Sequence, residues 1–379
     1  MSSSWIGGQN YVFNLVSTYR AARPDRKIFL VSSFDTVPDI LTPLVDSGEV
    51  VVLKVPELNA LRSPVVLARI LLRGFAPDVS QKIQAAGITH VFSPTLYLGR
   101  RPGITVITWI PDFQHRFLPH LFSRARWWMR EFSYRLCARS ANRIILSSFD
   151  AKQSYQKMAP DQPDKAVVVP FTPTLDPLKK NELAKILAEH DLDAPFIYLP
   201  NQFWKHKNHM LVITALEALV ARGWDGLLVI TGSGYDHRDQ AYVETLKARL
   251  AKMEEKGSVR MLGQVPREHV LAFLQCARCL INPSLFEGRS STVEEAIALG
   301  TPMILSDLPV HREQAGDMAK YFDPADPEAL SELIAQVPLE RGDTATPDHR
   351  TELADGFAAR QAKFATQLCV AIEGPQAGI

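Results

Sequence analysis

Two glutamates, Glu287 and Glu295, have side chains and a spacing that suit the binding of a polar ligand, with seven residues between them. They flank a hydroxyl-rich loop, GRSST, that follows the strand-like run Cys279–Pro283 and opens the helix-like run Thr292–Leu299. Gly300 fits a C-terminal cap for that helix. This order of strand, loop and helix places the loop at the edge where open parallel sheets bind ligands.

The start of this helix predicts a site for a phosphate. The first N–H groups of a helix lack an intrahelical acceptor and carry partial positive charge. Glu295, about a turn into the helix, would accept hydrogen bonds from a ribose, and Glu287 from a sugar beyond the phosphates. Spacing alone leaves an interpretation of both as solvated residues equally open. The loop residues expected at the phosphates are Gly288, Arg289, Ser290, Ser291 and Thr292.

Two further segments follow predicted strands. NQFWKHKNH holds Lys205 and Lys207, and a lysine at such a junction can neutralise a leaving diphosphate without a metal. WIPDFQHRF holds Asp112, which could orient a hydroxyl, and His115, which could contact the reacting sugar or its acceptor. Taken singly, the lysines are more typical of a solvated helix start, and the histidine is more typical of a packed core.

Composition narrows the class of protein. A chain of 379 residues suits two domains, and its 46% apolar and 22% charged residues are typical of a globular protein. A net charge of +1 gives no reason to expect nucleic acid. Four cysteines, no secretory signal and no membrane-length apolar run favour the cytoplasm. The histidines show no metal-ligand spacing, so we expect neither a bound metal nor another cofactor.

Short β-branched runs alternate with helix-length segments, which predicts an α/β protein with parallel sheets covered on both faces. A Pro-rich stretch, 170–177, predicts a boundary between a first domain, 1–175, and a second, 176–352, followed by a helix and tail, 353–379. The expected strands are Lys27–Ser32, Val50–Val55, His90–Ser93, Ile104–Trp109, Arg143–Ser147, Ala166–Pro170, Phe196–Leu199, Leu227–Thr231, Val259–Leu262, Cys279–Asn282, Met303–Ser306 and Ala319–Phe322.

The glycine pair Gly7-Gly8 is expected in a turn after a strand, where backbone N–H groups would meet a ligand. Only MSSSWI precedes it, about half a strand. The first strand of a doubly wound sheet is central, so the pattern predicts either a stub or a missing segment, and favours the latter.

Together these segments resemble the retaining glycosyltransferases with the GT-B fold, known as group 1 or family 4. EGRSSTVEEAIALGTPMILSD resembles the E-x7-E signature of that family, and NQFWKHKNH its donor-phosphate segment. WIPDFQHRFLP is similar to a subgroup from bacterial surface-polysaccharide synthesis. The resemblance implies two doubly wound Rossmann-like domains facing across a cleft, and it allows the C-terminal helix to cross back to the first domain.

The resemblance also implies residue roles. Glu287 would contact the donor sugar, Glu295 the ribose and Lys207 the diphosphate, while the turn at Val265 would hold the base. The reaction implied is metal-independent transfer, with retention, from a nucleotide-diphosphate sugar to a glycan or lipid-linked acceptor. A sugar-nucleotide epimerase and an inactive sugar-nucleotide-binding protein remain as alternatives.

Three positions depart from the family pattern. Gln202 stands where the family has an arginine, so Lys205 would substitute or the diphosphate would be held less firmly. Pro111 precedes Asp112 where the family has a histidine, which leaves His115 as the candidate imidazole. The segment before Gly8 is shorter than the first strand of the family pattern, and the phosphate and acceptor contacts of that pattern near Gly8 depend on this strand.

Residues 116–143 contain seven arginines and one acid, Glu131, among aromatic side chains. Trp128, Phe132 and Leu136 repeat every four residues, so they would form one apolar stripe of a helix. Such a helix could lie on an anionic membrane and hold the protein at the inner face of the plasma membrane. An ordinary helix packed on its own sheet is equally consistent. The arginines at the same spacing are Arg126 with Arg130 and Arg135 with Arg139.

Overall fold

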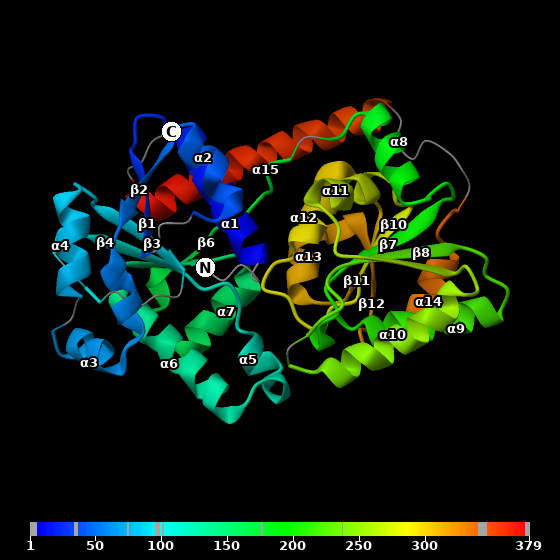
Figure 1. Ribbon diagram of the computed structural model, residues 1–379, viewed down its shortest axis with the longest axis horizontal. Coiled ribbons are helices and arrows are strands. Elements are labelled where there is room, and N and C mark those ends of the chain that lie inside the picture. Colours follow the sequence, from blue (N-terminus) through cyan, green and yellow to red (C-terminus); the bar gives the residue numbers. More distant parts are fainter. Residues whose placement is uncertain are drawn as a thin grey trace. The chain divides into compact units, whose positions relative to one another are not determined.

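The computed structural model describes residues 6–33, 37–73, 76–94, 99–100, 102–175, 177–236, 238–339 and 347–375. The chain forms two compact α/β units, coloured by sequence in Figure 1. Unit 1 contains Met1–Thr174 and Arg360–Ile379, and unit 2 contains Leu175–Ala359. The last helix therefore begins in unit 2 and ends in unit 1. The sequence predicted residues 353–379 as a helix and tail separate from both domains.

Unit 2 is built on six parallel strands in the order β12-β11-β10-β7-β8-β9. The order changes direction at β7, because its two neighbours are β8 and β10. Such a switch point is where open α/β sheets bind ligands, beyond the carboxyl ends of the strands. The strands are β7 Phe196–Pro200, β8 Leu227–Thr231, β9 Val259–Gly263, β10 Cys279–Asn282, β11 Met303–Ser306 and β12 Ala319–Phe322.

Helices cover both faces of this sheet. Strand β7 shows why, since Phe196 and Tyr198 enter one apolar cluster and Ile197 and Leu199 the opposite one. On the Ile197 side lie α9 His209–Ala221, α10 Gln240–Glu254 and α14 Pro327–Ala335. On the Phe196 side lie α8 Lys180–Glu189, α11 Arg267–Cys276, α12 Ser291–Leu299 and α13 Pro309–Ala315. The expected two-sided packing is confirmed.

Unit 1 has parallel strands in two sheets, β1-β2 and β3-β4-β5-β6. Residues 1–5, where the sequence analysis expects the first strand, lie outside the described residues. Gly7 and Gly8 lie in the first turn of helix α1, which begins at Ile6, so the expected glycine turn is helical. The strands are β1 Ile28–Ser32, β2 Val50–Lys54, β3 His90–Pro94, β4 Thr105–Trp109, β5 Arg143–Leu146 and β6 Ala166–Val168.

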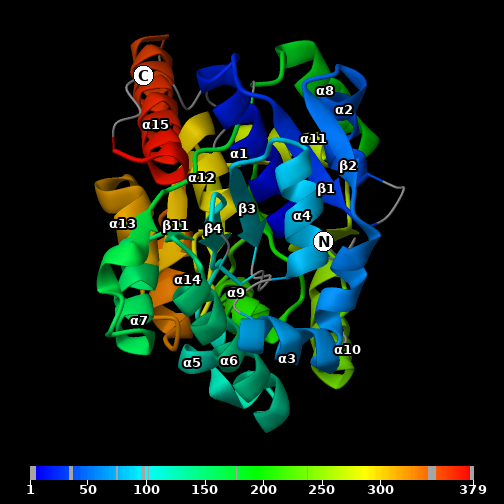
Figure 2. The same ribbon diagram turned by 90° about the vertical axis from the view of Figure 1, so that its left-hand side faces the viewer.

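Two apolar clusters also form in unit 1. Strand β4 divides between them, because Val106 faces the first cluster and Ile107 and Trp109 face the second. The first cluster takes residues from α3 Pro64–Arg73, α4 Pro77–Ala85, α6 Arg124–Ser140 and α7 Phe149–Met158. The second takes residues from α1 Ile6–Ala22 and α15 Pro347–Glu373. The remaining α-helices are α2 Thr42–Asp46 and α5 Gln114–Phe117. Figure 2 shows unit 1 from its own side, with α3, α5 and α6 at one end.

The docking of α15 generates a stability prediction. Leu368 is fully buried in the second cluster beside Phe364, so Leu368→Ala should lower the free energy of unfolding by about 2–5 kcal/mol. Urea unfolding followed by far-ultraviolet circular dichroism measures this. Lys363→Ala, an exposed change on the same helix, should cost less than about 0.5 kcal/mol. Equal losses in the two variants would contradict the packing described here.

Candidate functional site

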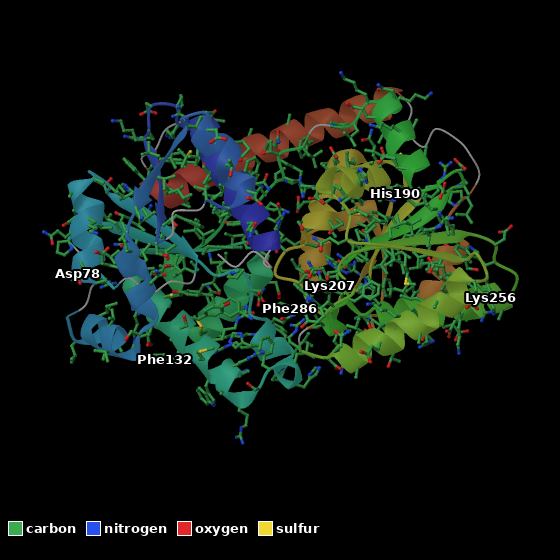
Figure 3. All side chains as sticks on the ribbon, in the orientation of Figure 1. Asp78, Phe132, His190, Lys207, Lys256 and Phe286 are labelled. Carbon is green, nitrogen blue, oxygen red and sulfur yellow. The ribbon has the colours of Figure 1, made fainter. Side chains whose placement is uncertain are left out.

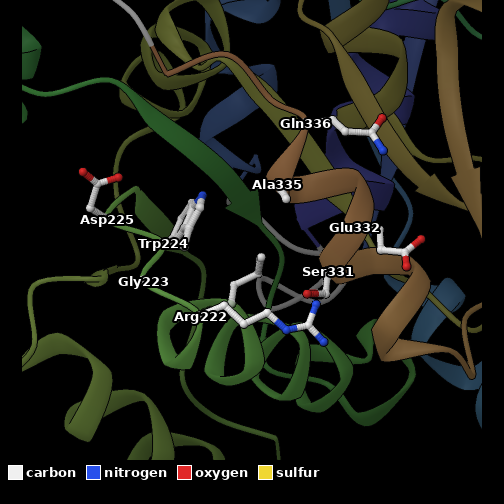
Figure 4. A pocket seen from close by; sticks show the side chains of 9 residues that line it. Arg222, Gly223, Trp224, Asp225, Ser331, Glu332, Ala335 and Gln336 are labelled. Atoms are coloured by element: carbon white, nitrogen blue, oxygen red, sulfur yellow. The ribbon is translucent and has the colours of Figure 1, made fainter.

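The two loops at the switch point of unit 2 contact each other directly. One follows β7 and contains the short 3-10 helix Lys205–Lys207; the other follows β10 and leads into α12. The backbone N–H of Leu285 donates to the carbonyl of His206 at 2.8 Å. Figure 3 labels Lys207 and Phe286, which lie at the same end of unit 2. Two segments that the sequence analysis treated separately therefore form one site.

The centre of the site is an ion pair between Lys207 and Glu287, with Nζ 2.6 Å from Oε1. Both side chains are largely buried, at 15% and 10% exposure. Burial by itself would raise the pKa of the Glu287 carboxyl. The charges of Lys207 and His311 and the hydrogen bonds from Lys207 and Ser284 outweigh burial and lower that pKa to about 2. Glu287 is therefore an anion held beside a cation, and not a solvated loop residue.

A buried polar network fixes the loop that carries Glu287. The Ser284 hydroxyl lies 2.7 Å from Glu287 Oε1 and 2.8 Å from Asn282 Oδ1. The amide of Asn282 donates to the Ser290 hydroxyl at 2.9 Å, and Ser306 donates to the Ser284 carbonyl at 2.6 Å. Because these groups are buried and mutually bonded, they hold the loop in one conformation.

The N-terminus of α12 has the geometry expected of an anion site, but two of its predicted residues act differently. Ser290 is the N-cap residue without a capping side chain, and its backbone N–H donates to Gln314. The guanidinium of Arg289 is only 5% exposed and bonds Glu294 at 2.5 Å, with Glu313 3.5 Å away. Arg289 therefore ties the loop to α12 and α13 and does not present its charge to a ligand. The N–H groups left for an anion are the first three of the helix, Ser291 to Val293.

Glu295 is buried on α12 and pairs with Arg267 at 2.8 Å. Burial raises the pKa of Glu295, and the charge and hydrogen bond of Arg267 offset this only in part. Arg267 opens α11 directly after the Gly263–Pro266 turn, so the ion pair joins Glu295 to the turn that contains Val265. The interpretation of Glu295 as a solvated helix residue is excluded.

The glycine-rich turn after β8 also belongs to this edge. Gly232 has φ +129°, and a Cβ there would stand 2.4 Å from the carbonyl oxygen of Asn201. Only glycine allows the turn to pack on the backbone that leads from β7 to Lys207. The N–H of Phe203 donates to the Ser233 carbonyl across the same contact. The turn therefore supports the loop that carries Lys207.

Lys205 does not take part in the ion pair at the centre of the site. Its ammonium group bonds Asp239 at 3.2 Å on the exposed surface and lies over the ring of Tyr242. Gln202 is half-buried in the same loop. In this conformation Lys205 does not supply the cation that is absent at position 202.

In unit 1, Asp112 and His115 follow β4 as expected but face different surroundings. Asp112 is half-buried, bonds Arg130 of α6 at 2.7 Å and accepts from the N–H of Gln114. His115 is fully buried, with Nε2 3.1 Å from Glu131. Burial lowers the pKa of His115, against the opposing effect of Glu131. We therefore assign His115 a structural role in place of the contact with a sugar or acceptor that the sequence analysis expected.

The sequence analysis missed His311 of α13. Its Nδ1 lies 2.8 Å from the Ser306 carbonyl oxygen, which only accepts, so Nδ1 carries the proton. Burial lowers the pKa of His311, against the opposing effect of Glu287, and its buried Nε2 has no hydrogen-bond partner among the described residues. The charges of Glu287 and Lys207 act on this ring. A proline at the first helical position, Pro309, was the available signal for α13, but nothing in the sequence linked its histidine to Glu287.

The segment that contains this site is similar to known glycosyltransferases. Residues 182–352 match the family model "Glycosyl transferases group 1". The chain is 35% identical to O-antigen chain mannosyltransferase B of Escherichia coli over a segment of 81 residues. This segment covers 21% of each chain. Over 96 residues it is 30% identical to O-antigen chain mannosyltransferase RfbU of Salmonella typhimurium, which is 25% of this chain and 27% of that protein. The matched segments thus span about a quarter or less of these relatives.

Solved structures share the fold of the whole chain. A glycosyltransferase from Rickettsia africae aligns with a TM-score of 0.64 at 15% identity, covering 96% of this chain and 91% of that one. Anabaena Alr3699/HepE in complex with UDP aligns with a TM-score of 0.65 at 15% identity, covering 97% and 95%. The chain has the GT-B fold of two Rossmann-like domains.

The described residues contain no group of three or more His, Cys, Asp or Glu placed to hold a metal ion. Within the same ranges, no helix combines the length and apolar character required to span a bilayer.

The Lys207–Glu287 pair predicts unequal effects of two lysine substitutions. Lys207→Met leaves a buried carboxylate without its cation and should cost about 3–5 kcal/mol of unfolding free energy. Lys205→Met, which breaks an exposed pair, should cost less than about 1 kcal/mol. Chemical denaturation of both variants measures the difference. Similar losses would show that the Lys207 pair is not buried in solution.

The low pKa of Glu287 predicts a pH dependence. Its folded-state pKa of about 2 lies below the ordinary value of 4.5, so the stability it contributes is present above pH 4.5 and is lost as pH falls toward 2. Between pH 7 and pH 3 the stability difference between wild type and Glu287→Gln should shrink by roughly 2 kcal/mol. Denaturation curves of both proteins at the two pH values measure it. A constant difference would mean an ordinary pKa.

Proposed function

We propose that this protein is a retaining glycosyltransferase that moves a sugar from a nucleotide-diphosphate sugar to a glycan or lipid-linked acceptor. The observation that carries the proposal is the Lys207–Glu287 pair at the switch point of unit 2, inside the segment that matches group 1 glycosyltransferases. An anion-binding cation and a sugar-binding carboxylate stand in direct contact there, which suits a ligand that carries both phosphates and a sugar.

Each chemical group of the proposed donor is assigned to a different part of the site. Its diphosphate lies at Lys207 and at the N–H groups that open α12, where charge-assisted hydrogen bonds stabilise the departing diphosphate. Its ribose lies at Glu295 and its base at the turn containing Val265. Glu287 binds hydroxyls of the transferred sugar, because a carboxylate accepts two or more hydrogen bonds.

Donor binding exchanges the partners of the central pair. In the free protein Lys207 bonds Glu287; with donor bound, the diphosphate oxygens replace that carboxylate at Lys207. Glu287 is then free to accept from sugar hydroxyls, next to the unpartnered Nε2 of His311. Interactions that strengthen as charge develops on the leaving diphosphate accelerate the step. We propose that no metal takes part and that the phosphate accepts the proton of the attacking hydroxyl.

The proposed acceptor class rests on the relatives. Both curated relatives are mannosyltransferases of O-antigen chains, which supports a role in bacterial surface-polysaccharide synthesis. Crystal structures of the Anabaena protein contain UDP, UDP together with glucose, or UDP-glucose. These complexes support a nucleotide sugar as the donor class. We place the reaction in the cytoplasm, where nucleotide sugars are made.

The proposal predicts selective binding and turnover of one donor. A panel of GDP-, UDP- and dTDP-sugars should raise the melting temperature of the wild type with one base only, and that donor should then be hydrolysed or transferred above background. Glu287→Ala should lower turnover by at least 100-fold, since it removes contacts to the reacting sugar. Lys205→Met is the matched control and should keep turnover within about threefold.

Three outcomes discriminate the alternatives. Conversion of the donor sugar to its epimer without acceptor would identify an epimerase, and binding without turnover an inactive binding protein. Nuclear magnetic resonance of the product gives the anomeric configuration. An inverted product would exclude the retaining mechanism.

A further inference from the structure

Helix α6 presents one continuous stripe of basic and aromatic side chains to solvent. Its members repeat at intervals of four, four, three and four residues, so they share one helical face: Arg124, Trp128, Phe132, Arg135 and Arg139. All five are exposed, Trp128 at 65% and Phe132 at 50%, and Met129 beside them is 68% exposed. Leu136, expected in this stripe, is buried, so the apolar part of the stripe is aromatic and is interleaved with arginines.

The opposite face of α6 explains why this stripe faces outward. Tyr134 and Ala138 pack into the first apolar cluster of unit 1. The buried Glu131 accepts hydrogen bonds from Arg116 and from Arg135, which keeps its carboxylate ionised in the interior. Its pKa is about 2, since these charges and hydrogen bonds outweigh burial. Trp128 packs edge to face on Trp127, with ring centroids 4.9 Å apart, and its side chain still remains 65% exposed.

The arginines of this region divide into two groups. Arg116, Arg130 and Arg135 pair with carboxylates of unit 1. Arg124, Arg126 and Arg139 are exposed and have no ion pair among the described residues. The expected pairing of Arg126 with Arg130 as one basic surface is therefore wrong for Arg130, whose guanidinium bonds Asp112 at 2.7 Å. The net charge of the chain is only +1, so this positive surface is local.

A second helix adds apolar area nearby. Leu72 of α3 is 87% exposed and Leu71 is 45% exposed, while Ile70 packs into the same apolar cluster as α6. Figures 1 and 2 agree in placing α3 and α6 at the same end of unit 1, and Figure 3 labels Phe132 on the α6 side of that end.

We propose that this end of unit 1, centred on the α6 stripe, binds the surface of an anionic lipid bilayer. Arginine guanidinium groups pair with lipid phosphates, while the tryptophan and phenylalanine enter the boundary between headgroups and acyl chains. Two exposed aromatic residues that lie between the unpaired Arg124 and Arg139 on one helical face fit this occupant. A symmetric dimer through the stripe would set the arginines of one copy against those of the other.

Binding at this surface also has a consequence for the first unit. The ion pair of Arg130 with Asp112 ties α6 to the loop at the carboxyl end of β4. The bilayer would therefore lie beside the edge of the sheet at which a lipid-linked acceptor has to arrive. This consequence rests on the proposed function; the membrane contact does not.

Flotation of the full chain with vesicles tests the proposal. The wild type should float with phosphatidylcholine–phosphatidylglycerol vesicles at 70:30 and stay in the lower fraction with phosphatidylcholine alone. R124Q/R139Q should weaken binding by about 25-fold, roughly fivefold for each arginine of the stripe. W128S/F132S should abolish the binding that survives 0.5 M salt, because aromatic insertion is not screened.

A matched control removes the same charge elsewhere. K185Q/K256Q changes two exposed lysines of unit 2 and should keep vesicle binding within about twofold. The paired Arg116, Arg130 and Arg135 are left intact so that unit 1 folds, and circular dichroism checks every variant.

Several results would overturn the membrane proposal. These are equal flotation with neutral and anionic vesicles, equal loss in the lysine control, and lipid-free dimerisation that W128S/F132S abolishes. Competition of vesicle binding by RNA at an equal phosphate concentration would instead identify a general polyanion site. Donor hydrolysis in solution is measured without vesicles, so failure of the membrane proposal and failure of the proposed function are distinguishable.

Discussion

The buried ion pair between Lys207 and Glu287 is the contact around which unit 2 organises its ligand edge. Neither charge is stable alone in that interior, because burial of an unpaired ion costs several kcal/mol. Each loop therefore depends on the other: the loop after β7 supplies the cation and the loop after β10 supplies the anion. The switch in strand order brings the two loops together, since β7 and β10 are neighbours although about 80 residues separate them.

Buried polar groups maintain this arrangement on both sides. Asn282, Ser284, Ser290 and Ser306 fix the Glu287 loop through mutual hydrogen bonds, and Gly232 lets a third loop support the Lys207 loop. Such a network is rigid because every member has a partner. Among the described residues the buried Nε2 of His311 has no hydrogen-bond partner, and an unpartnered buried nitrogen that interacts with Glu287 is a reason to look for a ligand there.

Unit 1 also contains a buried carboxylate that is stabilised by basic side chains, and there the cluster has a structural role. Glu131 of α6 is buried, and His115, Arg116 and Arg135 bond its carboxylate. That cluster explains why a histidine after β4, at a position where a catalytic group was expected, is part of the core. It also separates the arginines that stabilise the fold from those that α6 leaves exposed to solvent.

Within the described residues, the sequence by itself determined the twelve parallel strands, nearly to the residue, and the two-unit α/β architecture, because β-branched runs and helix periodicity are local signals. It also identified Glu287, Glu295 and Lys207 as candidate site residues. Only the tertiary structure decided the partners. Lys207 bonds Glu287, Arg289 bonds Glu294, Arg267 bonds Glu295 and His115 bonds Glu131. Partner choice depends on which charges share a buried volume, and that is set by strand order and helix packing between segments far apart in the chain.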